Sequence, residues 1–588
     1  MKQFLITVAG VLVGLVVFLI IAPIVIVSLL VSSASQATVN PNRMVLSLDL
    51  REEMSDSRPQ SPFAAWGGRN NVIDIVQRIE AASRDNRVRG IYVRAQTFGM
   101  SPAHAEEIRS ALADFQRAGE GRFVIGHIQN EGVRLSMAGY MAVAGADELW
   151  LQGVSEFMPM GLSSEQSFFA DTLARYRVTA HFETREEFKS AADTLTQRGF
   201  TESNRLQTTE LLNSLYTQML AHIAADRSIT PAAARAAIEQ TPFTGQRARE
   251  LRLIDQLGQP EQAERAALDR AGEGAEIVDI LAYQPRPQTG GPTIAVVLGE
   301  GEIIGGTGES SPFGGSQLMR GDDVARALLD ASEDENVRAI IFRVSSPGGS
   351  VVASDQILAA LRTARERGRR VVVSMGDVAA SGGYYVAAEA DEIVASPTTI
   401  TGSIGVVGGS IVIGPALEHY FSVRSDQITV GSPLVTMFSP NRAMNPAERA
   451  AFSGFIDRAY TEFMTRVATG RDLTVAQVRE IARGRVWTGA QARERGLVDH
   501  VGGFTTALAR ARALANIGEN ERVQLRFYPA VRSPFEELQS FFGASAETAR
   551  AAAMLGALVG DERVQTFLRA QRDGDIAARS RADGIEVR

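Results

Sequence analysis

The chain of 588 residues contains one unit of roughly 200 residues written twice, and this repetition limits its fold more than any other feature. Three pairs of segments match in order and spacing: DNRVRGIYVR at 85–94 with DENVRAIIFR at 334–343, GYMAVAGADEL at 139–149 with GYYVAAEADEI at 383–393, and FTGQRARELRLIDQLG at 243–258 with WTGAQARERGLVDHVG at 487–502. The offsets are 249, 244 and 244 residues. Three collinear matches predict a duplicated structural unit.

Each copy alternates short apolar stretches with amphipathic ones. In the second copy, apolar strands are expected at 293–299, 338–344 and 369–375, with a helix near 353–367 between the last two. Strands that alternate with helices predict crossover connections and parallel sheets in an α/β fold. We therefore expect an N-terminal repeat at 41–282, a Pro- and Gly-containing linker at 283–292, a C-terminal repeat at 293–515, and a helical extension at 516–588.

The first 40 residues differ from the rest. Residues 4–31 carry no charge and are almost wholly apolar, which is long enough for a helix to span a bilayer. Lys2 precedes this run and no cation follows it until Arg43, so the positive-inside bias places the N-terminus in the cytoplasm and the remainder outside. The small residues of SSASQA at 32–37 leave cleavage after the span as an alternative.

Composition excludes several classes of function. The net charge is −8 and no dense basic run occurs, so we expect no nucleic-acid partner. The chain has no cysteine, which rules out disulfides and thiolate chemistry. Its six histidines show none of the usual metal-binding spacings, and we expect neither a metal nor a cofactor.

The two copies differ at the residues that carry chemistry. The second copy contains SSPGGS at 345–350, with the pair Gly348–Gly349, and AASGG at 379–383, with Ser381 at an expected strand-to-helix turn. A serine beside free backbone N–H groups suits acyl transfer, although a capping serine beside a Gly-rich turn is the commoner structural explanation. In the first copy, Met137 occupies the position equivalent to Ser381.

The first copy instead contains Lys189, within EEFKSAAD at 186–193. Only two of the sixty Lys and Arg residues are lysine, Lys2 and Lys189, and the matching window of the second copy at 430–438 has none. Arginine is never neutral, whereas burial can lower a lysine pKa from about 10.4 towards neutrality and make the amine a base. A surface cation is the alternative, and Glu187 would oppose the lowered pKa if it shared the face of Lys189.

The combined pattern of an apolar N-terminus, tandem copies, FKSA, SPGGS, AASGGYY and TGSIGV resembles the signal peptide peptidase family, SppA or protease IV, in its long Gram-negative form. The resemblance implies a fold similar to Clp proteases and crotonases, with Ser381 as nucleophile and Lys189 as general base. It also implies that Ser403 hydrogen-bonds the lysine amine. The oxyanion donors would be the backbone N–H groups of Gly382 and of one residue of the Gly348–Gly349 pair, for which we choose Gly349.

Ser345 departs from the family pattern, because many members have Asn or Asp at this position. The resemblance implies a membrane-anchored serine endopeptidase that degrades cleaved signal peptides through an acyl-enzyme, needs no cofactor, and forms a homotetramer on the periplasmic face of the bacterial inner membrane. Two alternatives stay open at this point. A crotonase-like acyl-CoA enzyme would use the same glycine N–H groups to bind a thioester enolate, and a non-catalytic membrane-tethered scaffold would use the glycines only as turns.

Overall fold

A computed structural model describes residues 40–58, 70–95, 100–129, 136–286, 290–308, 318–518 and 521–529. Contacts divide the chain into a unit of residues 40–531 and a second unit of residues 1–39 and 532–588. All described residues belong to the first unit, so the expected span at 4–31 lies outside them. Within the described ranges, no helix combines the length and the apolar character needed to cross a membrane.

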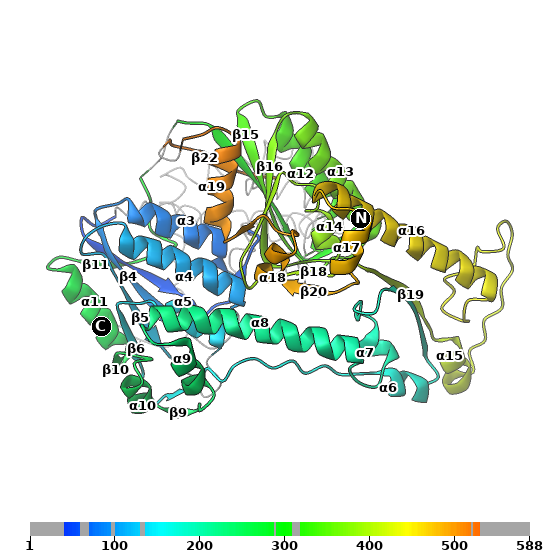
Figure 1. Ribbon diagram of the computed structural model, residues 1–588, viewed down its shortest axis with the longest axis horizontal. Helices are drawn as coiled ribbons and strands as arrows, with labels where there is room; N and C mark the ends of the chain where they lie inside the picture. The colour runs from blue at the N-terminus through cyan, green and yellow to red at the C-terminus, as the bar shows by residue number, and fades with distance from the viewer. Residues whose placement is uncertain are drawn as a thin grey trace, which may run out of the picture. The chain divides into compact units, whose positions relative to one another are not determined.

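The first copy builds a parallel sheet of six strands in the order β10-β6-β5-β4-β1-β11 (Figure 1). Its strands are β1 (Met44–Asp49), β4 (Val88–Ala95), β5 (Phe123–Ile128), β6 (Glu148–Leu151), β10 (Gln256–Leu257) and β11 (Glu276–Asp279). Every neighbouring pair in this order runs parallel. The strands are largely buried, as expected for parallel strands covered on both faces.

The second copy repeats this strand order as β21-β17-β16-β15-β12-β22. The strands are β12 (Thr293–Glu300), β15 (Val337–Ser346), β16 (Arg370–Ala380), β17 (Glu392–Ala395), β21 (His500–Val501) and β22 (Gln524–Tyr528). Two further strands, β18 (Ile400–Gly402) and β20 (Val486–Thr488), extend the sheet beside the C-terminal end of β16. The described part of the chain is therefore an α/β structure with two sheets whose six matching strands run parallel, and only the added β18–β20 pair of the second sheet is antiparallel.

Side-chain contacts repeat with the strands. The Tyr140 hydroxyl donates to the Leu253 carbonyl at 2.7 Å, and Tyr384, its equivalent, donates to the Leu497 carbonyl at 2.9 Å. Likewise, Arg227 pairs with Asp255, and Arg471 pairs with Asp499. Each of these residues lies 244 positions from its counterpart. The duplication thus extends to buried hydrogen bonds.

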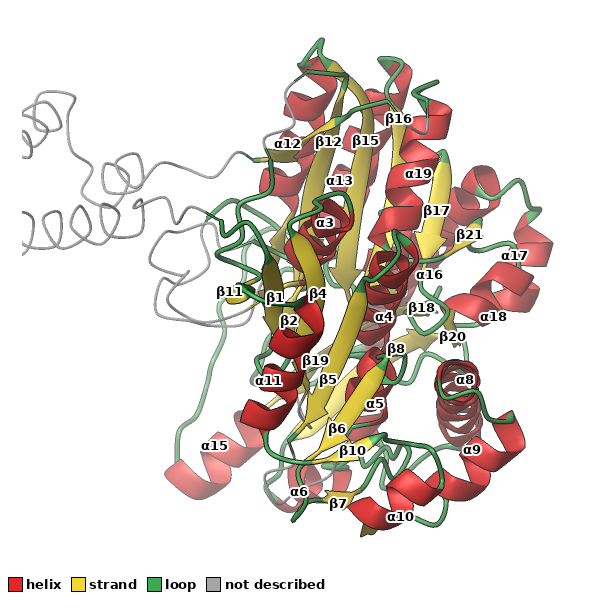
Figure 2. Cartoon of the chain, turned by 90° about the vertical axis from the view of Figure 1, so that its left-hand side faces the viewer, coloured by secondary structure: helices red, strands yellow, loops and turns green. Residues whose placement is uncertain are grey.

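The helices cover both sheets and fill the space between them. α11 (Pro260–Ala271) packs on one face of the first sheet, while α12 (Gly321–Glu333) and α13 (Val351–Glu366) pack on one face of the second. Between the two sheets lie α3 (Val72–Ser83), α4 (Pro102–Arg117) and α19 (Phe504–Leu514), as Figure 2 shows. The main core continues from the first sheet through these helices to Ile294, Ile341 and Val372 of the second.

The remaining elements include two equivalent helices of 25 residues, α8 (Glu202–Asp226) and α16 (Pro446–Gly470). The other helices are α5 (Met137–Val143), α6 (Ala170–Arg175), α7 (Asp193–Thr196), α9 (Pro231–Ile238), α10 (Gly245–Glu250), α14 (Gly382–Tyr385), α15 (Gly414–Phe421), α17 (Val475–Ile481) and α18 (Gly489–Glu494). The other strands are β2 (Met54–Ser55), β3 (Asn70–Asn71), β7 (Glu156–Phe157), β8 (Thr179–Arg185), β9 (Phe243–Thr244), β13 (Glu302–Ile304), β14 (Leu318–Arg320) and β19 (Val406–Val412).

One expectation at the C-terminal end is wrong. The sequence predicted helix from 516 onward, but Gln524–Tyr528 form β22, which pairs in parallel with β12. The segment QLRFY is rich in residues that favour strands, and it takes the place in the second sheet that β11 takes in the first. The boundaries predicted for the two repeats and the linker stay predictions.

Candidate active site

Ser381 occupies the sharp turn that joins β16 to α14. Its backbone adopts φ 55° and ψ −120°, a conformation that residues other than glycine rarely hold. Its N–H donates to the Gly402 carbonyl at 2.9 Å, which ties the turn to β18. A Cβ on Gly383 would lie 2.4 Å from the Ser346 carbonyl oxygen, so the second glycine after the serine is required for the close approach of β15.

Lys189 reaches this turn from the first copy. It lies in the loop between β8 and α7, and β8 pairs antiparallel with β19 of the second copy, which begins three residues after Ser403. Two glycines accommodate the lysine: a Cβ on Gly405 would lie 3.2 Å from its Cδ, and one on Gly484 would lie 2.6 Å from its backbone nitrogen. The Lys189 side chain is buried, with a residue exposure of 6 %.

The Lys189 amine lies at the centre of three polar contacts. Its Nζ is 2.9 Å from the Ser381 Oγ, 2.9 Å from the Ser403 carbonyl oxygen and 2.9 Å from the Ser403 Oγ. A neutral amine has two N–H donors and one lone pair. With both N–H groups on Ser403, the lone pair faces the Ser381 hydroxyl, which is the arrangement needed to accept its proton.

Burial lowers the pKa of Lys189 to about 7. Among the described residues no carboxylate forms an ion pair with its amine, which leaves desolvation to act unopposed. Glu187, which could have opposed this shift, instead pairs with Arg483 near the surface. The Glu186 carboxylate lies 4.0 Å from the Arg479 guanidinium. Both acidic neighbours therefore turn away from the amine.

Ser403 holds the amine from the turn between β18 and β19. Both Gly402, at φ 79°, and Ser403, at φ 50°, adopt left-handed conformations. The Ser403 N–H donates to the Arg485 carbonyl at 2.7 Å, which anchors the turn to the segment before β20. This backbone geometry presents both oxygens of Ser403 to one nitrogen.

Two backbone N–H groups converge beside the Ser381 hydroxyl. The Gly348 carbonyl accepts from Ile303 N–H at 2.9 Å and the Ile303 carbonyl accepts from Ser350 N–H at 2.8 Å, so the N–H of Gly349 points away from β13. A Cβ on Gly382 would lie 3.2 Å from the Gly349 nitrogen. Neither Gly349 N–H nor Gly382 N–H donates to another described backbone or side-chain group.

Gly348 allows close packing at this turn, but its N–H group is not a free hydrogen-bond donor. Its N–H donates to the Ser346 Oγ at 3.1 Å, and a Cβ there would lie 2.7 Å from both the Gly382 nitrogen and the Ser381 Cβ. The two free donors, the hydroxyl and the amine together can support nucleophilic attack on a carbonyl and stabilise the oxyanion that results.

Sequence reasoning missed Gln207, which holds the lysine loop. Its side chain is buried in α8, and the Nε2 donates to the Phe188 carbonyl at 2.9 Å and to the Ser190 Oγ at 2.8 Å. These are the residues on either side of Lys189. No sequence signal distinguishes this glutamine from the polar residues around it on the same helix.

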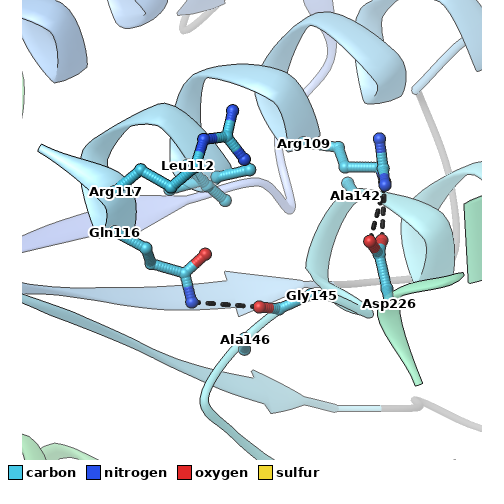
Figure 3. Close-up of a pocket in the computed structure, with 9 residues that line it drawn as sticks. Arg109, Leu112, Gln116, Arg117, Ala142, Gly145, Ala146 and Asp226 are labelled. Carbon is cyan, nitrogen blue, oxygen red and sulfur yellow. Dashed lines mark hydrogen bonds and ion pairs between the residues drawn. The ribbon is translucent and has the colours of Figure 1, made fainter. Parts of the chain in front are cut away.

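A separate cavity lies in the first copy between α4, α5 and α8 (Figure 3). Arg109 donates two hydrogen bonds to Asp226 along its wall, and Gln116 donates to the Gly145 carbonyl at 3.1 Å. Its lining contains none of the residues that surround Ser381. We assign the candidate active site to the Ser381–Lys189 contact and not to this cavity.

Comparisons with known proteins show which family the chain resembles. The family model described as peptidase family S49 matches residues 131–273 and 363–518. The chain is 32 % identical to Protease 4 of Salmonella typhi over 463 residues, 76 % of this chain and 72 % of that protein. It is 28 % identical to the chloroplastic serine protease SPPA of Arabidopsis thaliana over 82 % of this chain and 70 % of that protein.

A third relative matches part of the chain. An Enterococcus faecium protein named as a candidate signal peptide peptidase, SppA, is 33 % identical over 213 residues, 36 % of this chain and 61 % of that protein.

Proposed function

Because the chain belongs to peptidase family S49 and is a serine peptidase, we propose that Ser381 is its nucleophile and Lys189 its general base. The observation that carries this proposal is the 2.9 Å contact between the desolvated Lys189 amine and the Ser381 hydroxyl. The serine peptidase assignment replaces the two alternatives, a crotonase-like acyl-CoA enzyme and a non-catalytic scaffold.

The mechanism follows from the contacts around the amine. The Ser381 Oγ attacks the peptide carbonyl carbon while its proton passes to the neutral Nζ of Lys189, and the carbonyl electron pair moves onto oxygen. The N–H groups of Gly382 and Gly349 hold that oxyanion. The oxyanion then collapses, the C–N bond breaks, and the lysine ammonium gives its proton to the leaving amine.

Deacylation uses the same groups in the same order. The neutral Lys189 amine takes a proton from a water molecule, which attacks the acyl-enzyme carbonyl. Collapse of the second tetrahedral intermediate breaks the bond to the Ser381 Oγ, and the lysine returns the proton to it. Throughout, Ser403 keeps the amine oriented through both of its oxygens. Lys189 therefore acts as base and acid in turn.

The relatives and the sequence support a proposal for the substrate class and for the cellular location. We propose that the substrates are cleaved signal peptides and other apolar peptides, since one relative is named for that activity. The apolar run at 4–31 supports a single-pass anchor in the bacterial inner membrane with the catalytic part on the periplasmic side. The matching strand orders support two tandem Clp-protease- or crotonase-like repeats.

A homotetramer is also part of the proposal. Several large apolar side chains are strongly exposed at the end of α15 and on the segment that follows it, including Phe421 at 71 %, Ile428 at 98 % and Val430 at 90 %. Exposed apolar residues gathered on one segment are typical of an interaction surface.

The test compares the full chain in detergent with Ser381→Ala, Lys189→Ala and Lys189→Arg on a quenched apolar peptide. We expect kcat/KM to fall by about a thousandfold or more in all three, because arginine cannot accept a proton at neutral pH. Circular dichroism checks that each variant is folded. Wild-type activity in Lys189→Arg would rule out the dyad, because a permanently charged side chain would then suffice.

A further inference from the structure

A short segment of the second copy, residues 483–485 between α17 and β20, bridges the lysine loop and the turn that holds the amine. The Arg483 carbonyl accepts the N–H of Phe188, the residue before the lysine, at 3.2 Å. Two residues later, the Arg485 carbonyl accepts the N–H of Ser403 at 2.7 Å. This bridging segment therefore binds both the lysine loop and the residue that orients the lysine amine.

The backbone of the bridging segment allows its close approach to the lysine. Arg483 at φ 51° and Gly484 at φ 75° both adopt left-handed conformations. The Gly484 N–H donates to the Ile404 carbonyl at 3.0 Å, which is a third contact with the turn after β18. A Cβ on Gly484 would lie 2.8 Å from the Cβ of Lys189, so a larger residue would displace the lysine loop.

The first copy has a different sequence at the equivalent place. The Thr241 N–H donates to the Ile238 carbonyl at 3.2 Å, just as the Arg485 N–H donates to the Ala482 carbonyl at 2.8 Å, so the offset is again 244. At this offset the bridging segment RGR corresponds to EQT at 239–241. The two arginines and the glycine thus occur only in the copy that contacts the lysine loop.

The Arg485 side chain also reaches the first copy. Its guanidinium carbon lies 4.9 Å from the centroid of the Phe188 ring and 4.3 Å from the centroid of the Trp487 ring, and an arginine stacks favourably on aromatic rings at such distances. The guanidinium also pairs with Glu210 of α8. Both rings are buried. Arg485 therefore connects the lysine loop, α8 and β20.

The ion pair with Glu210 does not by itself explain an arginine at this position. The Glu210 side chain is 46 % exposed, and a pair with so exposed a partner stabilises a fold only slightly. The Arg485 Nε is buried and donates to no group among the described residues, which costs free energy. The stacking on Phe188 is the contact that distinguishes Arg485 from an ordinary surface cation.

We propose that Arg485 is a positioning residue, whose guanidinium holds Phe188 while its carbonyl holds Ser403. Together these two contacts fix the Lys189 amine relative to the Ser381 hydroxyl, so the inference rests on the proposed roles of that pair. Arg485 acts through its two neighbours and not on the substrate. A misplacement of about 1 Å at reacting atoms can lower a rate on the order of 100-fold, so a shifted lysine loop would be visible in kcat.

The test measures kcat and KM of the full chain in detergent, on a quenched apolar peptide for which acylation limits the rate. Arg485→Met loses the charge and the planar group, whereas Arg485→Lys keeps a charge near Glu210 but loses the planar stacking. We expect kcat to fall about 10- to 100-fold in both variants, with KM within about twofold of the wild-type value. Glu210→Gln removes only the ion pair and should keep kcat within about threefold.

Arg495→Met is the matched control. The Arg495 guanidinium carbon lies 3.8 Å from the centroid of the same Trp487 ring, but its hydrogen bonds go to Gln491 and Glu494 of α18. This variant should keep the wild-type kcat. Circular dichroism checks folding, and Arg485→Lys decides the test if the methionine variant does not fold. An equal loss in the control, or wild-type kcat in the folded Arg485 variants, would overturn the proposal.

A double-mutant cycle tests whether Arg485 acts through Phe188. Phe188→Leu and Arg485→Met should each lower kcat about tenfold or more, whereas adding the second change to the first should cost less than about threefold, because both remove the same contact. Independent effects would multiply. A double variant whose loss equals the product of the two single losses would show that the stacking does not position the lysine loop.

Lys189→Ala in the same assay separates this inference from the proposed mechanism. Loss of activity in Lys189→Ala together with wild-type kcat in Arg485→Met would overturn the positioning role and leave the dyad in place. Activity retained in Lys189→Ala would overturn the dyad, and the positioning role with it. Loss in Lys189→Ala with a lowered kcat in Arg485→Met supports both.

Discussion

At the scale of single residues, the proposed mechanism depends on how one lysine is kept neutral. The chain uses arginine for fifty-eight of its sixty Lys and Arg residues. Among the described residues, Lys189 is the one Lys or Arg whose side chain contacts the Ser381 hydroxyl. Gly405 lies against its stem and Gly484 against its backbone, and among the described residues its amine meets hydroxyl and carbonyl oxygens but no carboxylate. Burial without a counter-charge is the physical origin of its lowered pKa.

The first prediction concerns the pH dependence of the reaction. Since the Lys189 pKa is lowered to about 7, the fraction of neutral amine rises about tenfold per pH unit below that value and levels off above it. We expect kcat/KM for an apolar peptide to follow this curve between pH 5 and 9, measured under conditions in which acylation limits the rate. A profile flat across this range would contradict the role of Lys189 as base.

The second prediction concerns stability and follows from the same pKa. The folded pKa of Lys189 lies below its unfolded value of about 10.4, so the unfolded chain binds more protons between about pH 7 and 10.4. The energetic cost of burying the lysine is therefore fully present below pH 7 and disappears as the pH rises through 10. Lys189→Met should raise the free energy of unfolding by roughly 2–4 kcal/mol at pH 6 and by little at pH 10.

Urea unfolding at pH 6, 8 and 10 measures this difference. Ser381→Ala serves as the control, because it keeps the lysine and should preserve the pH trend of the wild-type chain. Parallel stability curves for Lys189→Met and the wild-type chain would show that the lysine titrates normally in the folded state.

At the scale of elements, the site is assembled by pairing across the two copies. The β8–β19 pair carries Lys189 to Ser403, and α8 fixes the loop after β8 through Gln207. The glycines of β19 are required for this approach, since a Cβ on Gly409 would lie 2.1 Å from the His181 carbonyl oxygen. The lysine is therefore positioned by elements that lie far from it in the sequence.

The third prediction tests Gln207 as a positioning residue. Gln207→Leu keeps the volume but loses both hydrogen bonds to the lysine loop, so we expect kcat/KM to fall about 10- to 100-fold, on the scale of two lost hydrogen bonds. The loosened loop should admit water to the amine and shift the apparent pKa of the pH profile upward. Thr208→Ala, on the next residue of α8, is the control and should change neither quantity.

At this scale, the sequence indicated the residues that lie in motifs but not the elements that position them. The proximity of Ser381, Lys189 and Ser403 could be predicted, because each lies in a short motif of the family that the chain resembles, and their catalytic roles stay proposals. Gln207 and the β8–β19 pair could not, since a polar residue on a polar helix and a Gly-rich strand carry no local signal. β22 was predicted as helix because the Ala- and Arg-rich composition of the whole C-terminal region outweighed the short strand-favouring segment QLRFY, and its partner β12 lies 231 residues earlier in the chain.

At the scale of the whole described molecule, the two copies must stay rigidly joined, because one supplies the lysine and the other the serine. A buried charge cluster lies between them. Arg343 of β15 is fully buried and pairs at 2.5 Å with Asp56 and at 2.6 Å with Glu107, both from the first copy. Although burial alone would raise the pKa of Asp56, Arg343 and His104 hold it well below its ordinary value.

The fourth prediction concerns this cluster. Asp56→Ala or Glu107→Ala leaves the fully buried Arg343 short of a partner, so each should cost about 3–5 kcal/mol of stability. Replacing Arg343, Asp56 and Glu107 together by Met, Leu and Met removes the guanidinium and both of its carboxylate partners, and should recover most of that loss. Urea unfolding measures stability, and peptide hydrolysis measures the geometry of the site in the same samples.

The two readouts distinguish what the cluster contributes. If the charges set the relative position of the copies, the triple variant will be stable but will hydrolyse peptide more slowly. The two copies would then shift, and the 2.9 Å contact between the Lys189 Nζ and the Ser381 Oγ would not be held. If packing alone sets that position, the triple variant will recover both the stability and the activity of the wild-type chain. A stable and fully active Asp56→Ala variant would contradict both, since it would show that the uncompensated guanidinium finds another partner at no cost.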